Sequence, residues 1–571
     1  RCKMNYLFDK KYFLILFIYL FALPPLAYSA LETQENKIDQ VIKQIINADN
    51  HPYINTHVFS AYKQATDDLY FLSPQHLLWL DKKQLDKESF TAALQLLSLA
   101  KLSGLNEEHY NSSFLLSKWN ELDQQQEQVN LKELALLDTA ISISLLNFLS
   151  DLQYGRIDPK TLKFNFESGK HSGDFIPLIL SSIHNKKINT LIEAVEPKFP
   201  AYQKLKKALL SYRQIDTRQN HLQITYNSSL KPDETSEQII DVRQQLNLLG
   251  IESNNQQSNI YDNTLVNTIK DFQLRHGLED DGIIGKNTIK ALNTPLSNRI
   301  NQLELALERL RWLPKIKPGS VVIINIPSFQ LWVYDTSNED ISPLLNMKVI
   351  VGKSVKNQSP VFSADMYYLE FSPYWNIPKS ITVEEILPKL EKNALYLEQQ
   401  NMELVTGFHN NEQALPFTEE SVIKLETGEL KLRQRPGKGN ALGKVKFIFP
   451  NNYNVYLHDT PARRLFNKPK RDFSHGCIRV EKPAELASLL LESKPEWNQK
   501  KIKSAMQLQQ PKKVGLKKPV PVIIFYSTAL AVQDKIYFYD DIYSYDDELK
   551  LALLDHHISR QLRKDQKKVI H

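Results

Sequence analysis

A change in sequence texture near residue 319 constrains the fold of this chain more than any other feature. From about Glu32 to Ser228 glycines are few and apolar residues recur at steps of three and four, a spacing that predicts amphipathic helices. From Ser320 onward the sequence has short runs of β-branched and aromatic residues separated by turn residues, which predict strands. Because 571 residues exceed what one hydrophobic core supports, several domains are expected.

The predicted fold class is therefore multidomain α+β. A helical N-terminal scaffold and a three-helix module precede a mainly β domain that carries a helical lid insertion. The expected regions are a signal peptide or anchor at 1–30, a helical scaffold at 31–228, a three-helix module at 233–295, a sheet domain at 319–496 with an insertion at 377–432, and a C-terminal hairpin and tail at 497–571.

The scaffold region contains no group of residues that indicates chemistry. A long helix is expected to bury one apolar face and to stop at Gly155, just before Asp158-Pro159. The polar run from Asp123 to Gln128 is expected to be a loop. The residues of the apolar face are Leu134, Leu137, Ile141, Leu145, Phe148 and Leu152.

Capping and turn residues divide the region 233–295 into three short helices. Thr235 and Gln238 predict a capping box for the first helix, which Gly250 ends. Asp262 is expected to cap the second helix. A tight turn beginning at Asp281 leads into the third, so a compact module is predicted.

The insertion at 377–432 is charged and helix-like, and strands resume after it. A lid over an active site would have this sequence, and so would an inert excursion on the far side of the domain. Near the end of the chain, the segments 520–526 and 534–539 are expected to pair as a hairpin that returns to the sheet. The polar tail beyond Arg560 is expected to be solvated helix or disordered.

The N-terminal segment is typical of an exported protein. Two lysines precede the apolar run 12–23, and small residues follow, with a cleavage site expected near Ser29 or Ala30. A retained membrane anchor is the alternative. Met4 is the expected start, which places Cys2 outside the mature domains. The net charge of +6, from 71 basic and 65 acidic residues, is too small and too dispersed to indicate nucleic-acid binding.

Cys477 is then the single cysteine of the mature chain, so no intrachain disulfide is open to it and it is a candidate reactive thiol. A thiol is mostly protonated at neutral pH and needs a neighbouring base to become a nucleophile. His458, at the end of a strand-like run, supplies that base if the fold brings the two together. The backbone carbonyl of Asp459 is expected to hold the imidazole in one tautomer. The amides around Gly476 and Cys477 are expected to face an oxyanion.

Three other interpretations of these residues remain open. A lone cysteine in a sheet domain is often a small buried hydrophobic residue. His458, His475 and Cys477 together with Asp459 or Asp472 would suit zinc in residue type, but His-x-Cys lacks the usual ligand spacing and there is no second cysteine pair. The basic residues between Arg463 and Arg471 fit a solvated charged loop.

The arrangement of His458 followed by Ser474-His475-Gly476-Cys477 resembles the signature of the L,D-transpeptidase catalytic domain. The flanking segments 433–437, 440–443 and 458–461 resemble the large periplasmic branch of that family, whose members also carry a helical scaffold, a peptidoglycan-binding module and an inserted lid. Residues 281–292 resemble the end of that binding module. Arg479 is a departure, because many relatives have asparagine there, and it puts substrate detail in doubt rather than activity.

The resemblance implies roles for named residues. Cys477 would attack the carbonyl of the third residue of a stem tetrapeptide and release the terminal D-alanine, and an amine of a neighbouring stem would then take the acyl group to form a 3→3 cross-link. His458 would act as the base with Asp459 as its support, and Gly476 would belong to the oxyanion site. His475, Ser474 and Arg479 would shape the site, and Tyr456 and Trp375 would line the substrate groove. Neither a metal nor an organic cofactor is expected.

The resemblance also implies a setting in the periplasm, at the cell wall, with a part in cell-wall organization and cell shape. Peptidoglycan stem peptides are the expected partners, with D,D-carboxypeptidases and glycan synthases as further ones, no nucleic acid, and membrane contact only through the N-terminal segment. Three alternatives stay open: an L,D-carboxypeptidase that hydrolyses the same thioester, a non-catalytic peptidoglycan-binding scaffold, and a general cysteine protease.

Overall fold

The structure is a computed structural model that describes residues 37–565, apart from 74–75, 81–86, 125–129, 168, 170–172, 217–221, 338–341, 394 and 410–411. The expected signal peptide or anchor and most of the expected loop at 123–128 lie outside the described residues. Two compact units divide the chain: Arg1–Tyr154 with Lys170–Glu196 and Asp555–His571, and Gly155–Gly169 with Pro197–Leu554.

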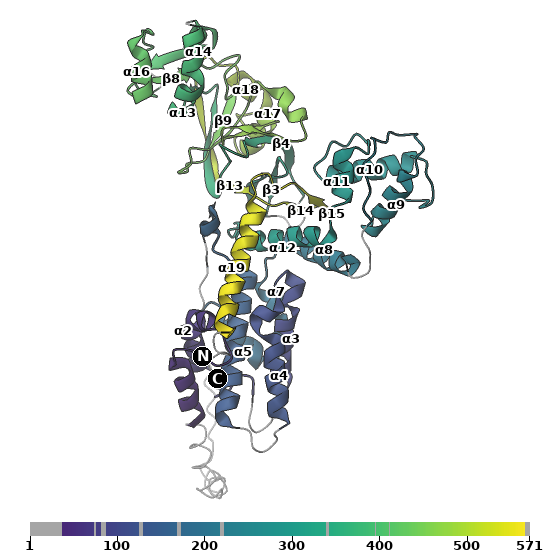
Figure 1. The fold of residues 1–571 in the computed structure, drawn as a ribbon. Coiled ribbons are helices and arrows are strands. Elements are labelled where there is room, and N and C mark those ends of the chain that lie inside the picture. Colours follow the sequence, from purple (N-terminus) through teal and green to yellow (C-terminus); the bar gives the residue numbers. More distant parts are fainter. Residues whose placement is uncertain are drawn as a thin grey trace, which may run out of the picture. The chain divides into compact units, whose positions relative to one another are not determined.

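The first unit is helical and is built around α5 (Leu131–Tyr154), which contacts α2, α3, α4 and α7 (Figure 1). Every side chain from Leu134 to Leu152 is buried, so α5 is buried on all sides, whereas the sequence had indicated one buried face. It is long and apolar enough to cross a membrane, but 94% of that stretch is buried inside the unit, as in the core helix of a globular domain. The other helices are residues 37–47, α2 (Thr56–Leu72), α3 (Lys87–Ser98), α4 (Ser112–Asp123), α6 (Ile176–His184) and α7 (Leu191–Val195).

In the second unit, α8 (Pro200–Asp216) packs against α12 (Leu296–Arg311), and a three-helix module with its own apolar core lies between them in sequence. The module consists of α9 (Gln238–Leu248), α10 (Asn263–Arg275) and α11 (Lys286–Leu292). Asp262 caps α10 as predicted, accepting a hydrogen bond from the Leu265 N–H at 2.9 Å. The prediction that Thr235 and Gln238 form a capping box is wrong, because the Gln238 N–H donates a hydrogen bond to the Ser236 hydroxyl instead.

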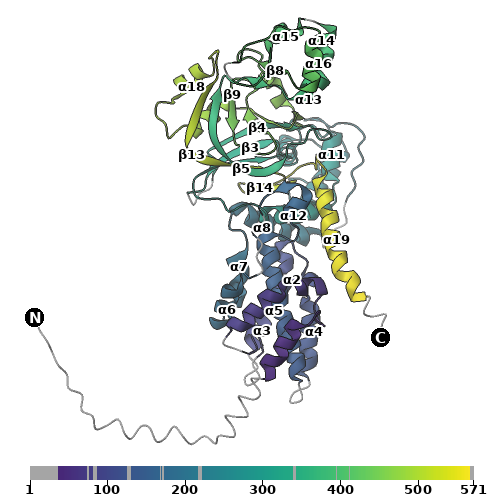
Figure 2. The ribbon, with the colours of Figure 1, turned by 90° about the vertical axis from the view of Figure 1, so that its left-hand side faces the viewer.

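The main sheet has the strand order β1-β5-β13-β2-β3-β4-β12-β10-β9, and β9 also pairs with β5, which closes the strands into a ring. Figure 2 shows β3, β4, β5, β9 and β13 side by side around this ring. A large apolar cluster joins side chains of these strands with those of the helices that pack on them. The strands are β1 (Phe164–Asn165), β2 (Ser320–Asn325), β3 (Gln330–Asp335), β4 (Leu345–Gly352), β5 (Val361–Phe371), β9 (Val445–Ile448), β10 (Leu457–His458), β12 (Ile478–Val480) and β13 (Lys512–Phe525), with β11 (Asp472–Ser474) paired to β4. The helices α17 (Pro483–Leu490) and α18 (Gln499–Ala505) follow β12.

The insertion has its own apolar core and contains a small sheet as well as helices. Its strands, in the order β6-β8-β7, are β6 (Trp375–Asn376), β8 (Lys431–Gln434) and β7 (Met402–Val405). The sequence did not predict this sheet, because its strands are two to four residues long. The helices are α13 (Lys379–Ile381), the π-helical η6 (Thr382–Ile386), α14 (Leu387–Lys392), α15 (Tyr396–Gln399) and α16 (Glu420–Thr427).

The pairing of segment 520–526 with 534–539 in a terminal hairpin is wrong. Residues 520–525 belong to β13, which lies between β5 and β2 in the main sheet. The end of β13 is buried, which suits a central strand better than a hairpin arm. The hairpin is formed by β14 (Ala529–Val532) and β15 (Lys535–Phe538) as a separate two-stranded sheet. After it comes α19 (Tyr545–Asp565), which is helical past Arg560.

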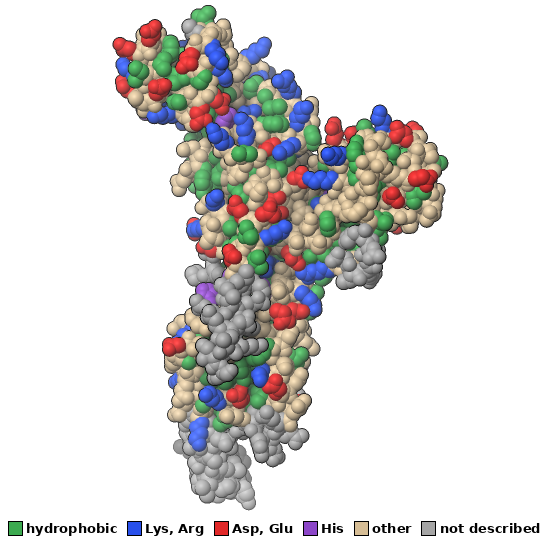
Figure 3. Space-filling model, in the orientation of Figure 1, with side chains coloured by type: hydrophobic (Ala, Val, Ile, Leu, Met, Phe, Trp, Pro, Cys, Tyr) green, Lys and Arg blue, Asp and Glu red, His purple; other side chains and the backbone are tan. Residues whose placement is uncertain are grey.

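The predicted fold class is confirmed: helices come first, and a β-rich domain with a partly helical insertion follows. On the face shown in Figure 3, basic and acidic side chains are interspersed, so the small net charge does not gather into a patch of one sign there.

Candidate active site

Cys477 lies in a tight turn that joins β11 to β12. The Ser474 hydroxyl accepts a hydrogen bond from the Gly476 N–H at 3.2 Å and donates one to the Cys477 carbonyl at 2.5 Å. The Lys353 N–H donates to the Ser474 carbonyl at 3.0 Å and so ties the turn to the end of β4. Gly476 has a φ of 108°, a conformation that favours glycine. The turn leaves the Cys477 side chain partly exposed.

The groups around the thiol include one aromatic side chain and two cations. Strand register pairs Leu457 with Ile478, which places Tyr456 beside Cys477. The thiol also lies 3.8 Å from the Asn454 carbonyl. Burial raises the pKa of the Cys477 thiol, whereas hydrogen bonds from Tyr456 and the charges of Lys446 and Arg479 favour the thiolate and lower it.

His458 is 4% exposed and is held in one orientation. Its Nδ1 lies 2.6 Å from the Asp459 carbonyl, the contact expected from the sequence. A carbonyl only accepts, so Nδ1 carries the hydrogen and Nε2 is unprotonated in the neutral ring. Burial, with Arg479 as the next cause, lowers the pKa of His458 to about 3, so the ring is neutral at pH 7.

Asp459 is itself fixed by the turn that precedes β9. Its carboxylate accepts a hydrogen bond from the Lys444 N–H at 2.9 Å and lies 3.4 Å from the Arg463 guanidinium. A Cβ at Gly443, where φ is 62°, would lie 2.5 Å from that carboxylate. Only glycine therefore fits at 443 without displacing Asp459 and, with it, the support of His458.

The structure brings the strands of His458 and Cys477 together without a hydrogen bond between the two side chains. His458 is in register with Arg479, so Tyr456 rather than His458 lies opposite Cys477. The His458 ring meets the Tyr456 ring edge-on, with centroids 5.7 Å apart. Among the hydrogen bonds of the described residues, none joins the imidazole to the thiol. Catalytic contacts are often long or unmade without substrate, so this geometry leaves the predicted pairing open.

Four charged residues and the neutral His458 form a row of paired residues across the sheet. Arg479, His458, Lys446, Glu370 and Lys513 are paired in that order on β12, β10, β9, β5 and β13. The Lys446 ammonium lies 3.8 Å from the centroid of the Tyr456 ring, and burial lowers its pKa. Sequence reasoning missed Lys446, because only the strand register shows that it is opposite His458.

The remaining predicted residues divide between the turn and the insertion. His475 Nε2 lies 2.5 Å from the Glu385 carboxylate of η6, so His475 contacts the insertion. Trp375 is on β6 and packs against the apolar core of the insertion. Its place in a substrate groove stays a prediction. Within the described ranges, no three His, Cys, Asp or Glu side chains gather as a metal site.

Three family models match the chain. Residues 319–522 match the L,D-transpeptidase catalytic domain, 64–209 a scaffold domain, and 235–292 a domain described as peptidoglycan-binding. The class that these matches and the fold define is a multidomain protein with an L,D-transpeptidase catalytic domain. In particular, the chain has the domain set of the large L,D-transpeptidases, in which a scaffold and a peptidoglycan-binding module accompany a catalytic domain with an insertion.

A Haemophilus influenzae protein that provisionally carries the name L,D-transpeptidase is 32% identical over 257 residues, which are 45% of this chain and 50% of that protein. The chain therefore matches about half the length of this curated relative. A crystal structure of an L,D-transpeptidase from Xylanimonas cellulosilytica is 13% identical and covers 53% of this chain and 99% of its own, with a TM-score of 0.17. One from Stackebrandtia nassauensis is 14% identical and covers 53% and 97%, with a TM-score of 0.21. Scores this low carry no conclusion.

Proposed function

We propose that this chain is a cysteine-dependent L,D-transpeptidase that forms 3→3 cross-links in peptidoglycan. The observation that carries the proposal is the placement of Cys477. Its partly exposed thiol lies in a fixed turn, within a domain that matches the L,D-transpeptidase catalytic domain, and is flanked by Lys446 and Arg479, while the neutral His458 is on the adjacent strand β10. A thiol with nearby cations and a base has what acyl transfer needs.

In the proposed reaction, the Cys477 sulfur attacks the carbonyl carbon of the third residue of a stem tetrapeptide. The carbon–nitrogen bond to the terminal D-alanine breaks, and D-alanine leaves with a proton on its amine. The stem then remains on the enzyme as a thioester. An amine of a neighbouring stem attacks that thioester, forms the new amide and releases the thiol, so no oxidant or cofactor is consumed.

His458 is proposed as the general base. The hydrogen bond to Asp459 places the hydrogen on Nδ1 and leaves Nε2 unprotonated, and the low pKa keeps the ring neutral at neutral pH. Because the same low pKa makes the ring a weak base, the transfer depends on groups that stabilise the thiolate. Lys446 and Arg479 would stabilise the thiolate that results. Gly476 and Ser474 would hold the turn, and His475, Arg479, Tyr456 and Trp375 would shape the groove for the stem peptide.

The setting is proposed as the periplasm, at the cell wall, after export through the N-terminal segment. The match of residues 235–292 to a peptidoglycan-binding domain supports binding of the chain to its polymeric substrate. D,D-carboxypeptidases, which would supply tetrapeptide stems, and glycan synthases are the proposed protein partners.

The test is mass spectrometry of products after incubation with disaccharide-tetrapeptide. The unsubstituted protein should form dimers that lack one D-alanine, and Cys477→Ala should form none while keeping its circular dichroism. His458→Ala should lose activity by a factor of about 100 or more. The exposed His184, in the helical unit, offers a control in His184→Ala, which should keep full activity.

Each other outcome has a definite meaning. Tripeptide monomers without dimers would replace the transpeptidase by an L,D-carboxypeptidase, in which water takes the acyl group. Turnover by Cys477→Ala would remove the nucleophile assignment. Binding of peptidoglycan without any product from the unsubstituted protein would favour a non-catalytic scaffold.

A further inference from the structure

The carbonyl of Gly476, in the peptide bond to Cys477, is held by a buried side chain from another part of the domain. The Ser359 hydroxyl donates a hydrogen bond to this carbonyl at 2.7 Å. A peptide unit is planar and trans, so its C=O and N–H point in opposite directions. Fixing the Gly476 carbonyl therefore fixes the direction of the Cys477 N–H.

Ser359 is fully buried and is fixed on two sides. Its hydroxyl accepts a hydrogen bond from the Gly352 N–H at 3.0 Å, and its own N–H donates to the Tyr543 hydroxyl at 3.1 Å. Tyr543 in turn donates to the Gly352 carbonyl at 2.6 Å. A Cβ at Gly352 would lie 1.9 Å from the Asn357 carbonyl, so only glycine allows this close return of the loop 352–359.

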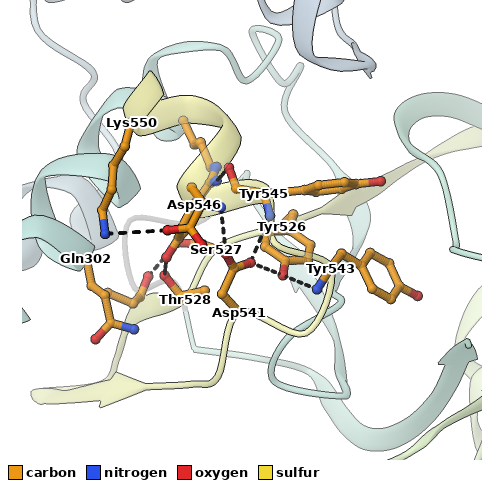
Figure 4. A network of polar contacts seen from close by, with 12 residues as sticks. Gln302, Tyr526, Ser527, Thr528, Asp541, Tyr543, Tyr545, Asp546 and Lys550 are labelled. Carbon is orange, nitrogen blue, oxygen red and sulfur yellow. Dashed lines mark hydrogen bonds and ion pairs between the residues drawn. The ribbon is translucent and has the colours of Figure 1, made fainter. Parts of the chain in front are cut away.

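Tyr543 belongs to the C-terminal segment that follows the hairpin β14–β15. Its N–H donates to the Tyr526 hydroxyl at 2.9 Å, and Tyr526 donates to Asp541 (Figure 4). Asp541 also accepts from the N–H groups of Tyr545 and Asp546 at the start of α19. Figure 4 shows the Tyr543 ring pointing away from this cluster.

A cation anchors the far end of the chain of hydrogen bonds. The buried Arg309 of α12 pairs with Asp546 and donates to the Tyr545 carbonyl at 2.7 Å. From Tyr526 to Gly476 each hydroxyl on the route donates its one proton to an acceptor, whereas the Nε of Arg309 has none among the described residues. Such a network is rigid, because displacing one member would leave buried polar groups unpaired.

We propose that Ser359 and Tyr543 are positioning residues that aim the Cys477 N–H at the oxyanion formed during acyl transfer. The C-terminal segment beyond residue 525 thus supports the nucleophile turn, although the match to the catalytic domain ends at residue 522. The inference deepens the proposed function and rests on it, because it assigns the oxyanion donor of the same acyl transfer. A donor held in place before the reaction needs no reorganisation in the transition state.

The test compares two reactions of Cys477 in the full chain. With p-nitrophenyl acetate, the thiolate attacks a carbonyl, an oxyanion forms, p-nitrophenolate leaves and the acetyl group stays as a thioester. With iodoacetamide, the thiolate displaces iodide from a saturated carbon and no oxyanion forms. Both reactions need the thiolate, so the thiolate fraction cancels from the ratio of the two rates, and the ratio reports on the oxyanion donor.

Ser359→Ala removes the hydrogen bond to Gly476, and Tyr543→Phe removes the support of Ser359. We expect the acylation rate to fall by a factor of about ten or more in Ser359→Ala and by less in Tyr543→Phe, with alkylation within about twofold of the unsubstituted protein. Tyr537→Phe, on β15, is the matched control and should change neither rate. Thermal unfolding of each variant shows whether it is folded.

The inference would be overturned if folded Ser359→Ala had the same ratio of acylation rate to alkylation rate as the unsubstituted protein, whether both rates stay the same or both fall equally. If Ser359→Ala does not fold, Tyr543→Phe decides in the same way. The two model reactions need no peptidoglycan substrate, so they test the positioning role even if the unsubstituted protein makes no dimers. The absence of dimers would overturn the proposed function and would leave the positioning role standing.

Discussion

The helical unit and the catalytic domain both use a buried polar network to fix backbone, but the two networks end differently. In the helical unit, Asp138 of α5 accepts hydrogen bonds from the N–H groups of Leu78, Trp79 and Leu80 and from the Tyr70 hydroxyl. All of its partners are internal. In the catalytic domain, the route through Tyr543 and Ser359 ends at a peptide whose next side chain is the partly exposed Cys477. The network around Asp138 can therefore act only on the fold, whereas the one that ends at Gly476 would, in the proposed role of Ser359 and Tyr543, also direct a reactive group.

The largest effect that would test this contrast is expected from Asp138→Ala. It leaves three buried N–H groups and one hydroxyl without their acceptor, at a cost of roughly 3 kcal/mol or more. Hydrogen exchange of peptides covering residues 76–80 and 131–154 should accelerate about 100-fold or more, because each 1.4 kcal/mol is a factor of ten. Alkylation of Cys477 should not change. The exposed Asp67 provides the control Asp67→Ala, which should not change the exchange. If exchange in Asp138→Ala were as slow as in the unsubstituted protein, Asp138 would not stabilise the helical unit.

The next largest effect is a change with pH in the stability of the helical unit, to which His51 and Asp138 contribute. His51 is buried, with hydrogen bonds to Thr139 and from the Tyr53 N–H, and burial lowers its pKa to about 4. An unfolded histidine titrates near ~6.5, so the stability contributed by the neutral ring is present above that pH and is lost as pH falls towards 4. Asp138 acts with the opposite sign: burial raises its pKa to about 6, so its contribution is present at low pH and is lost as pH rises through 6.

His51→Gln separates these two contributions. The difference in hydrogen exchange between the unsubstituted protein and the variant should grow by roughly one to two powers of ten from pH 4 to pH 6.5 and stay level above that. The exposed His57 gives the control His57→Gln, which should show no such growth. A difference that is constant with pH would mean that His51 does not titrate in this range.

A smaller effect is expected in the catalytic domain from Lys446→Met. Because burial raises the pKa of Cys477, alkylation by iodoacetamide should keep accelerating above pH ~8.5, where an ordinary thiol levels off. Removing the Lys446 charge should raise that pKa further and slow alkylation at pH 7 by several-fold. The exposed neighbour Lys444 supplies the control Lys444→Met. Equal rates for Lys446→Met and the unsubstituted protein would exclude an electrostatic role for Lys446.

The smallest effect is expected from Glu385→Gln, which weakens the contact of the insertion with His475. Both side chains are partly exposed, 32% for His475 and 41% for Glu385, and such pairs contribute no more than about 1 kcal/mol. Exchange of peptides covering 379–392 should accelerate by less than about fivefold, and Glu384→Gln should do less. A much larger change would mean that this contact alone holds the insertion.

The features that the sequence predicted correctly depend on residues close together in the chain. α5 ends at Tyr154 because Gly155, with a φ of 80°, follows it, and Asp262 caps α10 from the position next to it. The Asp459 carbonyl reaches the ring of the adjacent His458 for the same reason. The wrong capping box shows the limit of this reasoning, since Ser236 took the place expected for Thr235.

The features that the sequence missed depend on strand register and distant contacts. Lys446 matters because β9 pairs with β10 so that it faces His458, and no local pattern fixes that register. Ser359 is 117 residues from Gly476, and Tyr543 is 184 residues from Ser359. β13 was misplaced for the same reason, because its partners β2 and β5 are far upstream.

The central position of β13 also affects the order in which the protein can assemble. Val522 pairs with Val322, so the ring of strands stays open until residues 512–525 have been synthesised. Until then β2 and β5 present unpaired edges, which are prone to pair with other chains. The helical regions are rich in local contacts and are expected to form early, whereas the turn at Cys477 gains the support of Tyr543 only after the residues beyond β13 have been added. The reactivity of the Cys477 thiol would therefore depend on a segment that joins the domain after the strands that carry the thiol.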